Sequence, residues 1–313
     1  MRGECALNHE GVSGRQISAW LFAAMVPVGL QSLGGNWMLG LVLGGVGMVL
    51  AYVVWKRPRK PGRVESMLLI IYIMILIGQL LSDAALSWPL GNSDPAVPLI
   101  LLALAAWSAQ KGRSAASRMG SVLFWVVLVL YISVIVAGVR NVKLKWLRPE
   151  MTEVISLTPV IFLLPCAGLS LLKEKTSPGK KGFLTVVVLA AGLAVTAGVL
   201  SPAIADNLSN AFYVMCRSLE LMGAARRFEA LICAGGTVGW FALFSYLLMI
   251  CGSNLETIFC GKGRWSVWAI AAGAATWRLC GLHIEPGYLL IAGTVFWVAL
   301  PVLTQGLDKE KKS

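Results

Sequence analysis

The sequence has few charged side chains: Asp, Glu, Lys and Arg make up 13% of its 313 residues, against about 25% in an ordinary soluble domain. A water-soluble fold of this length needs far more polar surface, and a disordered chain combines low hydrophobicity with high net charge. Hydrophobic residues instead make up 57% of the chain, and the mean hydropathy is +0.75. The composition therefore excludes both classes and indicates a polytopic membrane protein.

The residue types that carry most metal and nucleophile chemistry are also scarce. The chain has two histidines, His9 and His283, and its seven cysteines form no CxxC pair. Most cysteines lie in or beside apolar runs, where a thiol behaves as a small hydrophobic group, so we interpret them as packing residues. Nucleophiles, bases and metal ligands do not cluster along the sequence. We therefore expect no catalytic residues, no metal site, no cofactor and no enzymatic activity.

Long apolar runs are abundant, and charged or Gly/Pro-rich segments separate them. Each run is about 20 residues long, which is the length of an α-helix that crosses the hydrocarbon core of a bilayer. The sequence therefore predicts an all-α polytopic membrane protein with about ten transmembrane helices. The predicted spans are Ile17–Leu33, Trp37–Trp55, Ser66–Trp88, Pro95–Ala109, Met119–Val139, Val154–Leu172, Phe183–Ala205, Phe228–Ile250, Val267–Leu282 and Gly287–Leu303.

The basic residues favour one orientation of these spans. If the N-terminus lies inside, the inner segments hold 19 of the 27 Lys and Arg residues, while the 15 acidic residues divide almost evenly. This distribution follows the positive-inside rule, so the basic runs need no nucleic-acid partner. We predict a cytoplasmic N-terminal tail at 1–14, a transmembrane domain at 15–305 and a basic cytoplasmic tail at 306–313.

Ten spans divide into two groups of five, repeat one at 17–139 and repeat two at 154–303. Because five is odd, the second repeat enters the membrane in the opposite orientation. Span one holds Pro27 and Gly29 at its middle, and its counterpart, span six, holds two prolines and a glycine between 159 and 168. Helices interrupted at matching places in the two halves are typical of transporter binding sites. We therefore predict a 5+5 inverted repeat with broken helices one and six.

Polar residues inside the predicted spans are few, and most lie beside these breaks. Unwound helix ends favour a small zwitterion, because a helix N-terminus attracts a carboxylate and freed carbonyls accept an ammonium group. A neutral polar residue in a membrane helix more commonly makes a helix–helix hydrogen bond, and this alternative stays open for each residue. The predicted ligand-binding residues are Pro27, Gly29, Gln31, Gln79, Ser156, Thr158 and Thr237.

The long segment 206–227, between spans seven and eight, has apolar residues at three- and four-residue steps. We predict an amphipathic helix on the outer surface, which either caps an entry vestibule or rests in the interface. Glu229 follows this segment and has Arg226 one helical turn before it, which predicts a local ion pair. The alternative is that Glu229 couples the outer helix to the binding site.

Short stretches at 118–149 and 217–230, together with Gln16–Ser18 and Leu163–Pro165, carry a family likeness over nearly the whole chain. They resemble spore germination permeases, the B subunits of germinant receptors. The resemblance implies an amino acid-polyamine-organocation transporter fold with a germinant-binding pocket at the first and sixth spans. It also implies assembly with an A subunit and a C lipoprotein in the inner spore membrane, or placement in the cell membrane of a spore former.

The resemblance implies a membrane-embedded receptor subunit that binds a small amino-acid-like germinant and triggers germination. The alternative is a secondary transporter, an amino-acid permease of the same fold. Many relatives have an acidic residue around the positions of Leu157 and Thr158, and this chain has none. The lack of a carboxylate at mid-membrane depth favours the receptor, because a proton-coupled carrier needs a titratable group.

Overall fold

The computed structural model describes residues 12–33, 36–56, 61–86, 96–147, 158–172, 179–205, 207–208, 210–219, 228–259 and 263–302. Within these residues the fold is all-α, with twelve α-helices. The helices in chain order are α1 (Gly14–Ser32), α2 (Trp37–Trp55), α3 (Arg63–Leu86), α4 (Ala96–Gln110), α5 (Arg113–Val139), α6 (Thr158–Ala167), α7 (Gly179–Leu200), α8 (Pro202–Ala205), α9 (Ala211–Ser218), α10 (Phe228–Ile258), α11 (Val267–Leu279) and α12 (Pro286–Thr294). Three 3-10 turns, η1 (Leu144–Trp146), η2 (Gly168–Leu171) and η3 (Gly263–Ser266), adjoin them, and the π-helical stretch η4 (Val295–Ala299) continues α12.

Five of these helices, α2, α3, α5, α7 and α10, are long and apolar enough to cross a membrane by length and composition. They identify the chain as an integral membrane protein. The ten α-helices of nine or more residues within the described ranges overlap the ten predicted spans, and α2 matches its predicted span residue for residue. Membrane crossing by all ten, and the inverted repeat, stay predictions.

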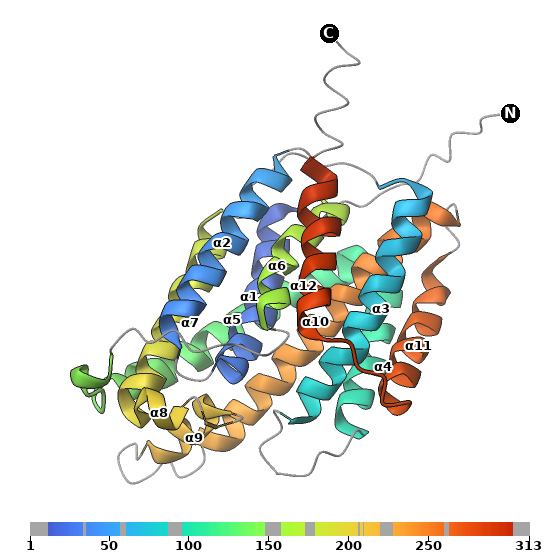
Figure 1. The fold of residues 1–313 in the computed structure, drawn as a ribbon. Helices are drawn as coiled ribbons and strands as arrows, with labels where there is room; N and C mark the ends of the chain where they lie inside the picture. Colours follow the sequence, from blue (N-terminus) through green and yellow to red (C-terminus); the bar gives the residue numbers. More distant parts are fainter. Residues whose placement is uncertain are drawn as a thin grey trace, which may run out of the picture.

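The helix α1 lies at the centre of the bundle (Figure 1). Sixteen of its 19 residues are buried, and it packs against α5, α7 and α10. In contrast, only 28% of the apolar window of α2, and the same share of that of α5, is buried inside the protein. A helix that is apolar on all sides and enclosed forms a core, whereas exposed apolar faces on a membrane protein contact lipid.

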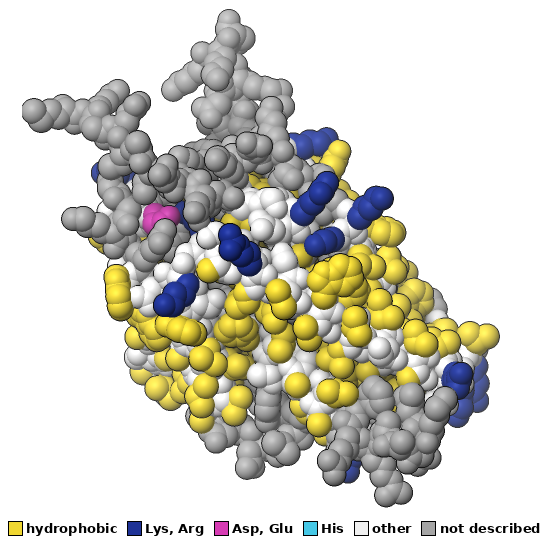
Figure 2. Space-filling model, turned by 180° about the vertical axis from the view of Figure 1, so that it is seen from behind, with side chains coloured by type: hydrophobic (Ala, Val, Ile, Leu, Met, Phe, Trp, Pro, Cys, Tyr) yellow, Lys and Arg dark blue, Asp and Glu magenta, His cyan; other side chains and the backbone are white. Residues whose placement is uncertain are grey.

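The start of α1 and the end of α12 lie at one end of the bundle, which we call the terminal end (Figure 1). Lys and Arg side chains gather toward this end, beside a hydrophobic band (Figure 2). Several of them lie over aromatic rings: Lys56 is 4.2 Å from the centroid of Tyr52, and Lys181 is 4.6 Å from that of Phe124. Long basic side chains at a membrane boundary extend their charge toward water in this way.

The predicted break in span one is wrong, because α1 runs through Pro27 as a continuous helix. A proline removes one backbone hydrogen bond and crowds the preceding turn, but the remaining bonds of the helix persist when neighbours enclose it. The facing residue on α10 is Gly239, where a Cβ atom would lie 2.5 Å from the Cβ of Pro27. The glycine therefore makes the room that the proline ring needs.

Span six does change its conformation, at Gly168, where α6 gives way to the 3-10 turn η2. Two carbonyl groups near this change are bonded to side chains of other helices. The Trp55 Nε1 group donates to the Pro165 oxygen at 2.8 Å, and the Tyr246 hydroxyl donates to the Leu164 oxygen at 3.2 Å. These bonds satisfy carbonyls at the end of the helix, as burial in an apolar environment requires.

The predicted outer helix is present in part as the eight-residue helix α9. Its apolar face is buried: Phe212 stacks on Tyr131 with ring centroids 5.4 Å apart, and Met215 is fully buried. Burial also raises the pKa of the Cys216 thiol, which therefore packs here as a small apolar group. Because α9 contacts α7 and α10, it covers the bundle end opposite the terminal end.

Candidate functional site

The predicted residue Gln31 lies in the contact between α1 and α10. Its side chain is 5% exposed, and its Oε1 atom accepts a hydrogen bond from Trp240 Nε1 at 3.1 Å. At Gly236 an added Cβ would collide with the Gln31 amide nitrogen. Gln31 therefore makes a helix–helix hydrogen bond in a closely packed contact, which is the alternative that the sequence left open.

Gly29 lies two residues before Gln31 on α1, where α1, α6 and α7 meet. A Cβ atom at Gly29 would lie 2.8 Å from Leu189 Cδ1 and 3.7 Å from Phe162 Cζ. Thr237, on α10, donates its hydroxyl to the Cys233 carbonyl of its own helix at 2.8 Å. The structure thus brings the predicted regions of α1, α6 and α10 together, but apolar side chains fill the space around Gly29.

Gln79 belongs to a separate cluster, far along α3 from the terminal end. Its Nε2 atom donates to the Leu282 carbonyl at 3.3 Å, and its Oε1 atom is 3.1 Å from His283 Nδ1. Asp83, one turn further on α3, lies within electrostatic range of His283. This cluster fixes α3 to the segment that joins α11 to α12.

Four residues of the sequence predictions lie wholly or with their side chains outside the described part of the chain. Ser156 lies outside the described residues, as does Arg226. Thr158 is the first residue of α6 and Glu229 the second of α10, while their side chains lie outside the described part of the chain. The ion pair of Glu229 with Arg226 and its alternative role in coupling stay predictions.

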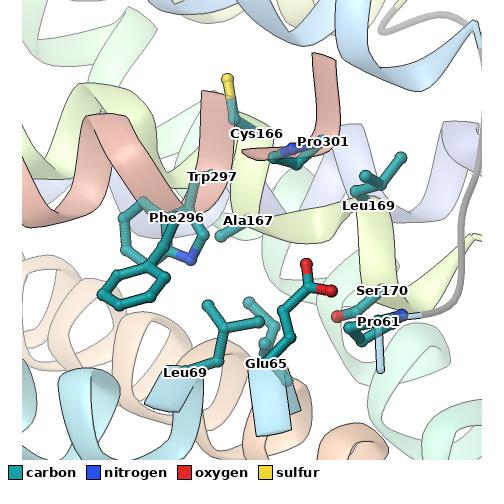
Figure 3. A pocket seen from close by; sticks show the side chains of 11 residues that line it. Pro61, Glu65, Leu69, Cys166, Ala167, Leu169, Ser170, Phe296, Trp297 and Pro301 are labelled. Atoms are coloured by element: carbon teal, nitrogen blue, oxygen red, sulfur yellow. The ribbon is translucent and has the colours of Figure 1, made fainter. Parts of the chain in front are cut away.

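The sequence reasoning missed a cavity of about 30 Å³ near the terminal end of the bundle (Figure 3). Four regions of the chain form its walls: the start of α3, the end of α6 with η2, the last third of α10, and η4 with the residues after it. Its lining residues are Pro61, Glu65, Leu69, Cys166, Ala167, Leu169, Ser170, Ile250, Phe296, Trp297 and Pro301.

The polar groups of this cavity differ in how they are satisfied. Trp297 is 3% exposed, and neither its Nε1 group nor the buried Ser170 hydroxyl has a hydrogen-bond partner in the described structure. Glu65 is half-buried, and its Oε2 atom accepts a hydrogen bond from the Gly62 backbone N–H at 3.1 Å. The carboxylate therefore stabilises the first turn of α3 while facing the cavity (Figure 3).

No periodicity or motif could have identified this cavity, because its walls come from segments more than 200 residues apart. The only sequence signals are an acidic residue in the first turn of span three and a tryptophan near the end of the last span, and both are ordinary features of membrane helices.

Comparisons with known proteins find no match: no protein-family model matches the chain, and no curated protein matches it.

Proposed function

We propose that this chain is the membrane-embedded subunit of a spore germinant receptor, built as a 5+5 inverted repeat of transporter type and binding a small amino-acid-like germinant. One observation carries the proposal: several of the contacts between helices recur when each helix of the first five is exchanged for its counterpart in the second five. The counterparts are α1 and α6, α2 and α7, α3 and α10, α4 and α11, and α5 and α12.

Three different helix pairs have counterparts under this exchange. The contact of α1 with α7 corresponds to the contact of α6 with α2. The contact of α3 with α11 corresponds to the contact of α10 with α4, and the contact of α1 with α5 corresponds to the contact of α6 with α12. The pairs α2 with α7, α3 with α10, and α4 with α11 map onto themselves and are also in contact. A regular exchange of this kind supports an inverted repeat, the architecture that places a ligand site between repeats.

The germinant site of this proposal lies where α1 and α6 meet, near Gly29 and Phe162, and binding there requires the apolar side chains that fill this space to move apart. The receptor subunit assembles with A and C subunits, and the exposed apolar faces of α2 and α5 are available for lipid or for these partners. A secondary transporter of amino acids is the second candidate, because the same inverted repeat serves transport. Accumulation of a solute is the property that separates the two.

Purified protein in proteoliposomes allows the two functions to be distinguished. Saturable binding of radiolabelled glycine or L-alanine without accumulation inside the vesicles is the result expected of a receptor subunit. Uptake of the amino acid into the vesicles, against or down its gradient, would identify a transporter instead. Absence of binding in any condition would contradict the proposal.

A matched pair of substitutions locates the pocket. Gly29→Ala adds a methyl group where α1, α6 and α7 meet and should weaken binding about tenfold, since it displaces Leu189 toward the pocket. Gly45→Ala, on α2, is the control, because a Cβ atom there meets no other atom within 4 Å. Equal affinities of the two variants would place the germinant away from Gly29.

The orientation is tested by single cysteines in an otherwise cysteine-free chain. Lys56→Cys, after α2, should react with an impermeant maleimide only from the cytoplasmic side, and Lys143→Cys, after α5, only from the outer side. Reaction of both from one side would contradict the predicted N-in, C-in topology.

A further inference from the structure

We propose that the segment from Arg140 to Trp146, which we call the basic segment, is a docking surface for anionic phospholipid headgroups in the membrane leaflet opposite the terminal end. The segment follows α5 and includes η1. Figure 1 shows it as the short green turn at the same end of the bundle as α8 and α9. The surface depends on membrane integration alone and is independent of germinant binding.

The charge of the basic segment is not explained by the topology of the chain. The segment holds Arg140, Lys143 and Lys145 and no acidic residue. The positive-inside rule accounts for basic residues at the cytoplasmic end, which is the terminal end in the predicted orientation. These three residues lie at the other end, all three are exposed, and none forms an ion pair within the described part of the chain. Their charge is therefore complementary to an anionic partner.

Contacts with α7 hold the basic segment in place. The Lys143 N–H donates to the Gly198 carbonyl at 2.8 Å, and a Cβ atom at Gly198 would lie 2.6 Å from Val142 Cγ1. The Lys143 Nζ atom is 4.3 Å from the centroid of the Trp146 ring, and the Lys145 Nζ atom is 5.7 Å from the same centroid. Because both ammonium groups lie at one ring, a phosphate beside that ring is attracted by both.

The exposed apolar residues favour a lipid over an acidic protein as the partner. Leu144 stands between the two lysines and is 80% exposed. On α5, Val129, Val136 and Val139 are each more than half exposed, and their spacing places them on one side of the helix. This apolar side ends at Arg140, so apolar and basic residues follow each other in the order of acyl chain and phosphate. Tryptophan and long basic side chains are typical of this boundary.

The charge of the headgroup determines which phospholipid fits. Phosphatidylcholine has no net charge, and its choline ammonium group is repelled by the three cations of the basic segment. Phosphatidylglycerol carries a negative charge and no cation. Each Lys or Arg near an anionic membrane surface adds to the attraction, and the Arg140 guanidinium can contact a phosphate through two N–H groups. The basic segment should therefore prefer phosphatidylglycerol to phosphatidylcholine.

Fluorescence quenching at single labelled positions measures this preference. Asn141→Cys, in an otherwise cysteine-free full-length chain, places a pyrene label at an exposed, uncharged residue of the basic segment. Leu41→Cys provides the control label, because Leu41 is 47% exposed on α2 and α2 contains no basic residue. Each protein is placed in phosphatidylcholine nanodiscs in which a minor fraction of the lipid is brominated phosphatidylglycerol or, for comparison, brominated phosphatidylcholine.

Two triple variants separate the effect of charge from that of packing. The neutral variant combines Arg140→Gln, Lys143→Gln and Lys145→Gln, and the charge-retaining variant combines Arg140→Lys, Lys143→Arg and Lys145→Arg. We expect brominated phosphatidylglycerol to quench the label at position 141 at least about threefold more strongly than brominated phosphatidylcholine. The neutral variant should lose this preference and the charge-retaining variant should keep it, while both lipids should quench the label at position 41 equally.

Equal quenching at position 141 by the two lipids, or a preference that persists in the neutral variant, would overturn the proposal. Lack of quenching by either lipid would also overturn it, and would indicate that the segment faces water or a partner protein. Thermal midpoints confirm the folding of each variant. Should the cysteine-free chain fail to fold, native mass spectrometry of the unlabelled variants decides: the neutral variant should retain less phosphatidylglycerol than the charge-retaining one, and equal retention would overturn the proposal.

Discussion

Two contacts between helices correspond to each other in the proposed inverted repeat, and they are packed very differently. The contact of α1 with α10 is among the most extensive in the bundle, whereas its counterpart, α6 with α3, is slight. The cavity lies at this second place, between the end of α6 and the start of α3. In the proposed repeat, one copy of the contact is closely packed and the other leaves a cavity, so the two copies would not contribute equally to stability.

The helix α10 takes part in both regions, so its two ends can be compared to explain the difference in packing. Near its start, Gly236 and Gly239 let α1 approach, and the polar groups there are paired with each other. Near its end, α10 places Ile250 in the wall of the cavity. One turn further on, the Ser253 hydroxyl donates to the Ser170 carbonyl at 3.1 Å. Helices in a membrane associate through close contact of small residues and through hydrogen bonds, and at Gly252, near this end, only Val267 lies within 4 Å of an added Cβ atom.

The largest expected effect comes from loosening the cavity end of α10. Arg113 and Glu256 form an ion pair of 2.6 Å there, with side chains 13% and 10% exposed. Arg113→Met leaves the Glu256 carboxylate in a largely dry environment and should lower the free energy of unfolding by about 3 kcal/mol. Titration with SDS in mixed micelles measures this change.

The double variant Arg113→Met with Glu256→Met serves as its control, because it removes both charges. We expect the double variant to be more stable than the single one. If the two variants are equally unstable, packing of the Arg113 stem, rather than charge, joins α5 to α10 at this end.

The second effect tests the closely packed region. Gly239→Ala brings a methyl group against the Pro27 ring and should destabilise the protein by about 1–3 kcal/mol. Gly252→Ala, on the same helix, is the control, since its Cβ would meet only Val267 Cγ2 at 3.4 Å. Because alanine favours a helix more than glycine does, Gly252→Ala should be neutral or slightly stabilising. Thermal midpoints in detergent report both, and equal loss in the two variants would contradict close packing of α1 on α10.

The sequence predicted the positions of the helices better than their ends. Apolar runs located α2 and α4 to within a residue, because such runs depend on composition alone. The helix α10 continues eight residues beyond the predicted Ile250, through Asn254 and Glu256, which read as loop residues in the sequence. Arg113, on α5, pairs with Glu256, and the Asn254 amide donates to the Ile250 carbonyl of its own helix at 3.0 Å.

The same limitation explains the errors at the site. Pro27 interrupts a helix only if its surroundings allow the chain to unwind, and Gly239, more than 200 residues away, decides that it stays helical. The cavity depends on how four segments converge. The residues that flank Glu65 and Trp297 in the sequence do not indicate a cavity, and only the tertiary structure brings these two residues together.

A third, smaller effect concerns the hydrogen bond between α1 and α10. Gln31→Leu removes the acceptor of the Trp240 N–H and leaves that group buried without a partner, which should cost about 1–2 kcal/mol. Gln31→Glu retains an acceptor but adds a charge in the core, and should cost more. The free energy of unfolding in SDS checks both, and a neutral Gln31→Leu would show that the bond contributes nothing to stability.

The smallest effect compares two tryptophans, one in each region, after the same substitution. Trp240 is 2% exposed and Trp297 is 3% exposed, so Trp→Phe removes a similar amount of buried ring from each. Trp240 donates to Gln31, whereas the Nε1 group of Trp297 has no partner among the described residues. Removal of a paired donor loses a bond and leaves the Gln31 acceptor unsatisfied, while removal of an unpaired donor relieves a desolvation cost. We therefore expect Trp240→Phe to be less stable than Trp297→Phe by about 1 kcal/mol, measured as thermal midpoints in the same detergent. Equal stability of the two variants would remove the distinction between the packed contact and the open one.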